Sequence, residues 1–139
     1  MLRCTVCAAV YPVSHGVIDL LPGGAGQRGL AQRAMESERV VDFCESQWWR
    51  RSALAALALG ISFEQEHALI TRVARVRREQ TVLDLGCGTG LYTRPFAQRA
   101  RPGLVIGLDL SAAMLRAAAQ FARQQQSHNV ILIRGTALH

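Results

Sequence analysis

The residues with the clearest chemical potential form a glycine-rich turn that begins with an acidic residue. The segment Asp84-Leu85-Gly86-Cys87-Gly88-Thr89-Gly90 follows a short apolar run and precedes a stretch with a helical pattern. Glycines at a strand-to-helix junction let the backbone approach a ligand that a Cβ atom would exclude. This turn is therefore the first candidate for a cofactor site.

The spacing and charge of this turn favour a cationic ligand over a pyrophosphate. Dinucleotide-binding turns read Gly-x-Gly-x-x-Gly and hold the pyrophosphate at a helix amino terminus, whereas this turn reads Gly-x-Gly-x-Gly. Asp84 would repel a phosphate and would accept hydrogen bonds from an amine. Asp109 ends the next apolar run, where a carboxylate can accept the hydroxyls of a ribose. Together these residues favour an adenosine joined to an amino-acid group.

The elements that position these residues alternate between strand and helix. The predicted elements are, in chain order, a strand at 81–85, a helix from Leu91 to about Ala100, a strand at 104–109, a helix capped by Ser111 and ending near Gln126, and a strand at 129–133. The short apolar runs are typical of parallel strands buried on both faces. We expect an α/β fold, a Rossmann-like doubly wound parallel sheet of which the chain holds the first three strands.

The chain before this sheet divides into a small segment, a linker and helices. In residues 1–22, apolar residues alternate with small ones, which is typical of short strands and turns, and the glycines of residues 23–30 predict a linker. Helical patterns follow, and a capping box at Ser62 predicts a helix that reaches about Arg78. We expect the sheet domain to occupy residues 31–139.

Two motifs of this chain resemble those of class I S-adenosylmethionine-dependent methyltransferases. Val82-Leu83-Asp84-Leu85-Gly86-Cys87-Gly88-Thr89-Gly90 resembles the first motif, and Gly107-Leu108-Asp109-Leu110-Ser111 resembles the second. The likeness covers about residues 64–135 and implies S-adenosyl-L-methionine as the cofactor. It implies that the turn with Gly86, Cys87, Gly88 and Gly90 lines the methionine portion and that Asp84 holds its amino group. It also implies that Asp109 binds the ribose and that Leu110 lies near the adenine.

Structural interpretations of the same residues remain open at this point. The glycines can serve only to turn the chain, Asp84 can cap the following helix, and Asp109 can pair with an arginine. A nicotinamide- or flavin-binding Rossmann domain is the less favoured cofactor alternative. We interpret Cys87 as a small packing residue without a nucleophilic role, and the sequence identifies no catalytic residue.

The resemblance implies methyl transfer to a small-molecule acceptor. Such transfer is a direct displacement at a sulfonium methyl group, so the protein has mainly to align donor and acceptor. By resemblance the chain is near the broad group that contains the ubiquinone and menaquinone C-methyltransferases. An rRNA guanine methyltransferase is the alternative enzyme, and a noncatalytic binding or interaction module is the alternative outside enzymes.

The cysteine pair near the amino terminus has the spacing of half a zinc site. Residues 1–22, with Cys4 and Cys7, resemble the second half of a zinc ribbon that precedes some methyltransferase domains. A structural zinc site needs four ligands, and Cys44 is more simply a core cysteine. We therefore predict no bound metal.

Composition limits the partners and the location of the chain. The net charge is +6, but all sixteen basic residues are arginine and they form no dense block, so nucleic acid is a less favoured partner. The closest group is Arg72, Arg75, Arg77 and Arg78, which we place at a helix end. No segment approaches the ~20 apolar residues of a membrane span, and the sparse cysteines favour the cytoplasm.

The chain is short for this family. It has 139 residues, and the resemblance places the acceptor pocket beyond a third strand, so we expect a fragment or one piece of a longer enzyme. The first strand would then present an unpaired edge, which predicts self-association. Trp48 and Trp49 fall where the resemblance places a helical lid, and packing on the core is their favoured interpretation.

Overall fold

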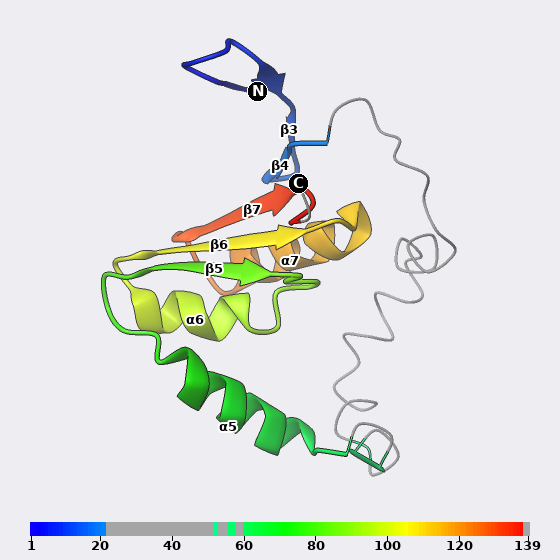
Figure 1. The fold of residues 1–139 in the computed structure, drawn as a ribbon, viewed down its shortest axis with the longest axis vertical. Helices are drawn as coiled ribbons and strands as arrows, with labels where there is room; N and C mark the ends of the chain where they lie inside the picture. Colours follow the sequence, from blue (N-terminus) through cyan, green and yellow to red (C-terminus); the bar gives the residue numbers. More distant parts are fainter. Residues whose placement is uncertain (22–51, 53–55, 58–59, 138–139) are drawn as a thin grey trace.

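The computed structural model describes residues 1–21, 52, 56–57 and 60–137. Its elements are β1 (Leu2–Arg3), β2 (Val10–Tyr11), β3 (Val13–Ser14), β4 (Val17–Asp19), α5 (Phe63–Ala74), β5 (Thr81–Leu85), α6 (Thr93–Ala100), β6 (Leu104–Asp109), α7 (Ala112–Gln124) and β7 (Val130–Arg134). They form a two-stranded sheet, β1-β2, and a five-stranded sheet in the order β3-β4-β7-β6-β5 (Figure 1). The predicted linker at 23–30 lies outside the described residues, as do Cys44, Trp48 and Trp49.

Three parallel strands form the middle and one edge of the larger sheet. β5 pairs with β6, and β6 pairs with β7, with Leu83 opposite Ile106 and Ile106 opposite Ile131. α6 and α7 connect these strands and lie on the same side of the sheet (Figure 1). This is the arrangement that right-handed crossovers in one direction produce. The predicted alternation and the Rossmann-like α/β fold are confirmed.

An amino-terminal hairpin extends this sheet beyond the three strands that the sequence predicts. β3 and β4 pair antiparallel, and β4 pairs parallel with β7. An ion pair of 2.9 Å joins Arg134 Nη1 to Asp19 Oδ2, and the Leu20 N–H donates to the Arg134 carbonyl at 2.9 Å. The larger sheet therefore has five strands, because the end of the small segment is hydrogen-bonded to β7.

Side-chain caps set the starts of two helices. The Ser62 hydroxyl accepts the Gln65 N–H, and the Gln65 side chain accepts the Ser62 N–H, so the predicted capping box of α5 is present. The Ser111 hydroxyl accepts the Met114 N–H at the start of α7, as predicted.

The predicted end of α5 at about Arg78 is wrong. The helix ends at Ala74, because Arg75 adopts a left-handed conformation with φ of 48°. The Arg77 N–H then donates to the Gln80 side chain in the turn before β5. Arg75, Arg77 and Arg78 therefore follow the last helical residue and do not share a helical face with Arg72.

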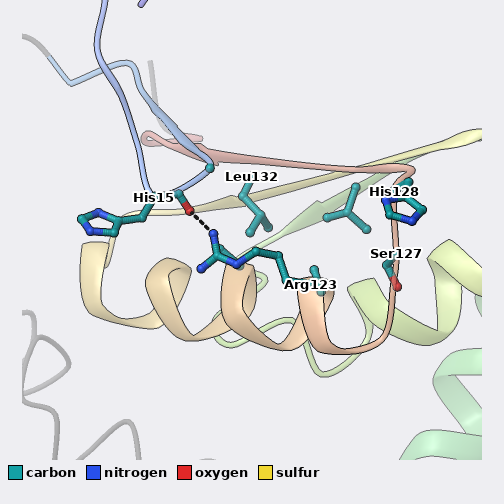
Figure 2. A pocket seen from close by; sticks show the side chains of 9 residues that line it. His15, Arg123, Ser127, His128 and Leu132 are labelled. Atoms are coloured by element: carbon teal, nitrogen blue, oxygen red, sulfur yellow. Dashed lines mark hydrogen bonds between the residues drawn. The ribbon is translucent and has the colours of Figure 1, made fainter.

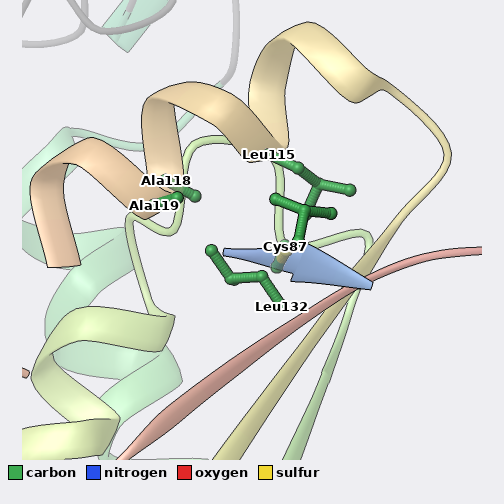
Figure 3. Close-up of a cluster of buried hydrophobic side chains, with 6 residues drawn as sticks. Cys87, Leu115, Ala118, Ala119 and Leu132 are labelled. Atoms are coloured by element: carbon green, nitrogen blue, oxygen red, sulfur yellow. The ribbon is translucent and has the colours of Figure 1, made fainter. Parts of the chain in front are cut away.

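The core lies between the sheet and its two covering helices. One buried cluster joins Cys87 to Leu115, Ala118 and Ala119 of α7 and to Val17 and Leu132 of the sheet (Figure 3). A second cluster contains Phe96, Ala97, Ala100 and Val105. The glycine turn thus rests directly on the buried core through Cys87.

Candidate cofactor site

The site lies where two adjacent parallel strands end. The turn of residues 86–90 leads from β5 toward α6, and Asp109 is the last residue of β6. The Leu108 carbonyl accepts the Gly86 N–H at 2.8 Å and the Cys87 N–H at 3.1 Å. These bonds hold the turn against the end of β6. The structure therefore brings Asp109 next to the glycine turn, although the two lie 21 residues apart in the chain.

Two glycines leave the backbone of the turn accessible. Gly86 and Gly88 have φ values of 70° and 54°, which residues other than glycine rarely adopt. A Cβ atom built on either residue would meet no heavy atom within 4 Å. The space beside this backbone is open, so a ligand can approach the peptide units directly.

The Asp109 carboxylate is held between the turn and the start of α7. Its Oδ2 accepts the Gly88 N–H at 2.8 Å, and its Oδ1 accepts the Ser111 N–H at 2.7 Å. Within the described residues these backbone groups, and not an arginine, are its partners. Each carboxylate oxygen has a second lone pair, so the group can still accept hydroxyl donors from a ligand.

Asp84 is fixed by Thr93, the first residue of α6. The Thr93 hydroxyl donates to Asp84 Oδ2 at 2.6 Å. Burial raises the pKa of Asp84, the hydrogen bonds from Thr93 oppose this shift, and the nearby charge of Asp109 adds to it. Asp84 thus also holds the start of the following helix, in line with the alternative that it caps this helix. A nearby cation would stabilise the charged form of its carboxylate.

Thr93 is the site residue that sequence reasoning missed. Its side chain is 2% exposed, and a Cβ atom built on Gly90 of the turn would lie 3.6 Å from the Thr93 Cβ atom. A threonine in the first turn of a predicted helix, after an acidic strand end, was the available signal. Nothing in the neighbouring sequence shows that the Thr93 hydroxyl donates to Asp84 and not to the helix backbone.

Four of the five N–H groups of residues 86–90 donate to acceptors within the protein. Gly86 and Cys87 donate to Leu108, Gly88 donates to Asp109, and Gly90 donates to the Cys87 carbonyl at 2.9 Å. A phosphate cradle needs such N–H groups directed at the ligand. With these donors engaged and two carboxylates nearby, the turn suits a cationic ligand and disfavours a pyrophosphate.

Cys87 and Leu110 have different surroundings at this site. The Cys87 side chain is buried in the core, as predicted, and burial raises the pKa of its thiol to about 12 (Figure 3). Any contact from this residue to a ligand must therefore come from its backbone. Leu110 is 37% exposed beside Asp109, and its placement near an adenine stays a prediction.

Comparison with known proteins finds methyltransferases that are similar to the part of the chain that holds this site. A methyltransferase domain matches residues 82–139, which contain the turn and Asp109. A demethylmenaquinone methyltransferase of Lactiplantibacillus plantarum is 53% identical over 60 residues, covering 42% of this chain and 25% of that protein. A demethylmenaquinone methyltransferase of Listeria welshimeri is 31% identical over 90 residues, covering 64% of this chain and 37% of that protein. These findings support a class I S-adenosylmethionine-dependent methyltransferase, with the matched domain beginning at residue 82.

A solved structure supports the fold assignment. A SAM-dependent methyltransferase from Aquifex aeolicus aligns with a TM-score of 0.53 and 20% identity, covering 72% of this chain and 47% of that chain. S-adenosylmethionine is the cofactor of this class of methyltransferases. The chain spans only a quarter to somewhat over a third of the two curated relatives' lengths.

The amino-terminal cysteines lie in a turn between β1 and β2. The Cys4 N–H donates to the Ala9 carbonyl, and the Ala8 N–H donates to the Cys4 carbonyl. Hydrogen bonds from the Cys7 and Val6 backbone lower the pKa of the Cys4 thiol. In the described part of the chain, no three His, Cys, Asp or Glu side chains gather as metal ligands would.

None of the helices in the described ranges is long and apolar enough to cross a bilayer.

Proposed function

We propose that this chain binds S-adenosylmethionine at the carboxyl ends of β5 and β6 and takes part in methyl transfer to a small molecule. The observation that carries the proposal is the juxtaposition of Asp84, the open backbone of Gly86 and Gly88, and Asp109 on two adjacent strand ends. The engaged N–H groups of the turn and the two carboxylates match a ligand with an ammonium, a sulfonium and a ribose.

Each residue has a separate task in this proposal. Asp84, held by Thr93, accepts hydrogen bonds from the amino group of the methionine portion. Asp109, fixed by Gly88 and Ser111, accepts the ribose hydroxyls. Gly86 and Gly88 allow close approach of the ligand to the backbone, and Leu110 provides an apolar surface for the adenine.

The cofactor, when bound, supplies an electrophilic methyl group on a sulfonium sulfur. The chain's task is then to hold this group in line with the acceptor, because orientation lowers the barrier of such a displacement. We assign no catalytic base to the described residues. Preorganisation by Thr93 and Ser111 matters because it keeps both carboxylates in place before the ligand arrives.

The proposed acceptor is an aromatic quinone precursor. The two curated relatives described above are demethylmenaquinone methyltransferases. The likeness covers the cofactor motifs, so it supports this acceptor less strongly than it supports the cofactor. Transfer of a labelled methyl group to demethylmenaquinone, compared with transfer to rRNA guanine, separates this acceptor from the alternative enzyme.

Calorimetry with S-adenosylhomocysteine tests the cofactor site. We expect saturable one-site binding by the wild-type chain and at least tenfold weaker binding by Asp109→Asn and Asp84→Asn. Glu64→Gln is the matched control, because it removes one exposed carboxylate from α5, away from the turn. Absence of binding by the folded wild-type chain would favour a noncatalytic interaction module instead.

We also propose that β5 mediates self-association. It is an edge strand of the five-stranded sheet. Among the described residues it pairs with β6 on one side and with no strand on the other. Unpaired edges readily pair with another chain.

A cytoplasmic location is proposed from the sparse cysteines alone, and nucleic acid remains the less favoured partner.

A further inference from the structure

The ends of three neighbouring strands line up beside Asp109. Arg134, the last residue of β7, pairs in register with Asp109 at the end of β6 and with Asp19 at the end of β4. The Arg134 side chain is 13% exposed and forms its 2.9 Å ion pair with Asp19, whose side chain is 29% exposed. Leaving so buried a cation without its partner is costly. The position of the Arg134 guanidinium is therefore set in part by the amino-terminal hairpin.

The hairpin that carries Asp19 is itself held against the domain. Along β4 it pairs with β7, and at its tip the Arg123 Nη1 of α7 donates to the His15 carbonyl at 3.2 Å (Figure 2). The Asp19 carboxylate is fixed in turn by the Leu21 N–H, which donates to Oδ1 at 3.0 Å. The other carboxylate oxygen, Oδ2, is the one that meets Arg134. Asp19 thus offers Arg134 an anion that is already in place.

Arg134 also bonds to the peptide unit that holds the Asp109 carboxylate. Its Nε donates to the Leu110 carbonyl at 3.3 Å. The N–H of the same peptide unit belongs to Ser111 and donates to Asp109 Oδ1 at 2.7 Å. A peptide unit is planar, so its carbonyl and its N–H turn together. A group that orients the Leu110 carbonyl therefore also directs the Ser111 N–H at the carboxylate.

The end of β7 holds the preceding peptide unit as well. The Gly135 N–H donates to the Asp109 carbonyl at 3.0 Å, so two successive carbonyls are bonded from this strand end. The charge of the guanidinium adds to this geometry, because hydrogen bonds in a chain polarise one another. A cation at the Leu110 carbonyl strengthens the bond that the Ser111 N–H makes at the other end of the peptide unit.

We propose that Arg134 is a positioning residue that, held by Asp19, orients the Asp109 carboxylate for the ribose of S-adenosylmethionine. It acts through the peptide unit between Leu110 and Ser111, without contact to the ligand. The inference rests on the proposed cofactor site and makes the amino-terminal hairpin part of what builds that site. Loss of Arg134 should therefore weaken binding of the adenosine part of the ligand.

Two ligands separate the two parts of the site in calorimetry. Methylthioadenosine carries the adenosine without the amino-acid group, whereas S-adenosylhomocysteine carries both. Arg134→Ala should weaken the binding of both ligands by about two- to tenfold, the range of one hydrogen bond. Asp84→Asn should weaken the binding of S-adenosylhomocysteine alone. Asp19→Asn removes the charge of the ion pair and should weaken both ligands in the same way, by a smaller factor than Arg134→Ala.

Amide NMR of the ligand-free chain tests the positioning itself. In Arg134→Ala the Ser111 amide proton should shift upfield, because its hydrogen bond to Asp109 weakens. Arg134→Lys keeps the charge but has all its donors on one nitrogen, so it cannot reproduce the separate contacts of Nη1 and Nε. It should keep most of the wild-type melting temperature and still show the Ser111 shift and the loss of affinity. Arg99→Ala, at an exposed position of α6, is the control and should change neither.

The outcomes distinguish this inference from the proposed cofactor site. Wild-type binding with unchanged affinity in Arg134→Lys, or an unmoved Ser111 resonance, would overturn the inference and leave the cofactor site standing. A loss of S-adenosylhomocysteine affinity without a loss of methylthioadenosine affinity would also overturn it. Absence of binding by the folded wild-type chain would overturn both proposals. Arg134→Lys keeps the test decisive if Arg134→Ala does not fold.

Discussion

The two faces of the parallel sheet differ although the same strands build both. On one face, Val105 and Leu132 are 0% and 3% exposed beneath α6 and α7. On the other face, Leu83 and Leu85 of β5 are 57% and 58% exposed. Both sets are apolar, so the residue types alone do not explain the difference.

The cause lies in the direction of the crossovers. α6 and α7 connect strands that follow each other in one direction across the sheet, so right-handed connections place both helices on one face (Figure 1). Alternate residues of each strand, such as Leu83, Ile106 and Ile131, therefore point to the opposite face. These apolar residues are therefore suited to burial that no helix in the described ranges provides.

The sharpest test of this difference is truncation of one leucine on each side. Leu115 of α7 is 0% exposed within the Cys87 cluster, so Leu115→Ala should lower the free energy of unfolding by about 2–5 kcal/mol. Leu83→Ala on the open face should cost about 1 kcal/mol or less, because most of that side chain is already hydrated. Urea denaturation measures both, and equal losses would contradict the comparison.

Self-association tests whether the edge strand β5, with its exposed leucines, contacts a second copy of the chain. We expect the wild-type chain to form dimers or larger species, and Leu83→Lys with Leu85→Lys to shift it toward monomer by placing charge on the edge strand. Light scattering after gel filtration gives the mass of each. Leu69→Lys, at a half-exposed position of α5, is the control and should keep the wild-type mass. A monomeric wild-type chain would refute association through this surface.

Close packing on the covered face predicts a smaller effect at Gly107. A Cβ atom at this position would lie 3.0 Å from both Cys87 Sγ and Leu132 Cδ2. Gly107→Ala should therefore destabilise the fold by about 1–3 kcal/mol and disturb the turn through Cys87. Thermal unfolding measures this, and an unchanged melting temperature would show that the contact relaxes freely.

The pKa of Asp84 should depend on the hydrogen bond that Thr93 donates to it. Its pKa lies above the usual value, so this group favours folding more at low pH, and that contribution is lost as pH rises from 3.8 through the folded pKa. Thr93→Val removes a hydrogen bond that lowers the pKa, so the midpoint should rise further. Carbon NMR titration of the Asp84 carboxyl group measures it, and a midpoint that falls or stays would contradict this role.

The sequence predicted those elements whose signal is local. The strands at 81–85 and 104–109 were predicted at their observed bounds, and Ser62 and Ser111 were correctly identified as caps. The end of α5 was missed, because a left-handed Arg75 has no distinctive sequence signal. The pairing of β4 with β7 was also missed, since it joins segments far apart in the chain.

The candidate site follows the same division. The glycine turn and Asp109 were recognisable because their spacing and strand-end positions are local patterns. The Gly88 bond to Asp109 and the Thr93 bond to Asp84 depend on how two loops meet, so only the structure reveals them. The engagement of the turn's N–H groups, which favours a cation over a phosphate, is likewise a tertiary property.

Amide NMR mapping of S-adenosylhomocysteine binding is the decisive test of a cofactor site at the ends of β5 and β6. We expect the largest shifts at Gly86, Gly88, Asp109 and Leu110, with little change at Leu83 on the open face or at Val130 at the start of β7. Asp109→Asn should reduce the shifts at a given ligand concentration. Shifts centred on any other surface, or none in the folded chain, would contradict a cofactor site at the ends of β5 and β6.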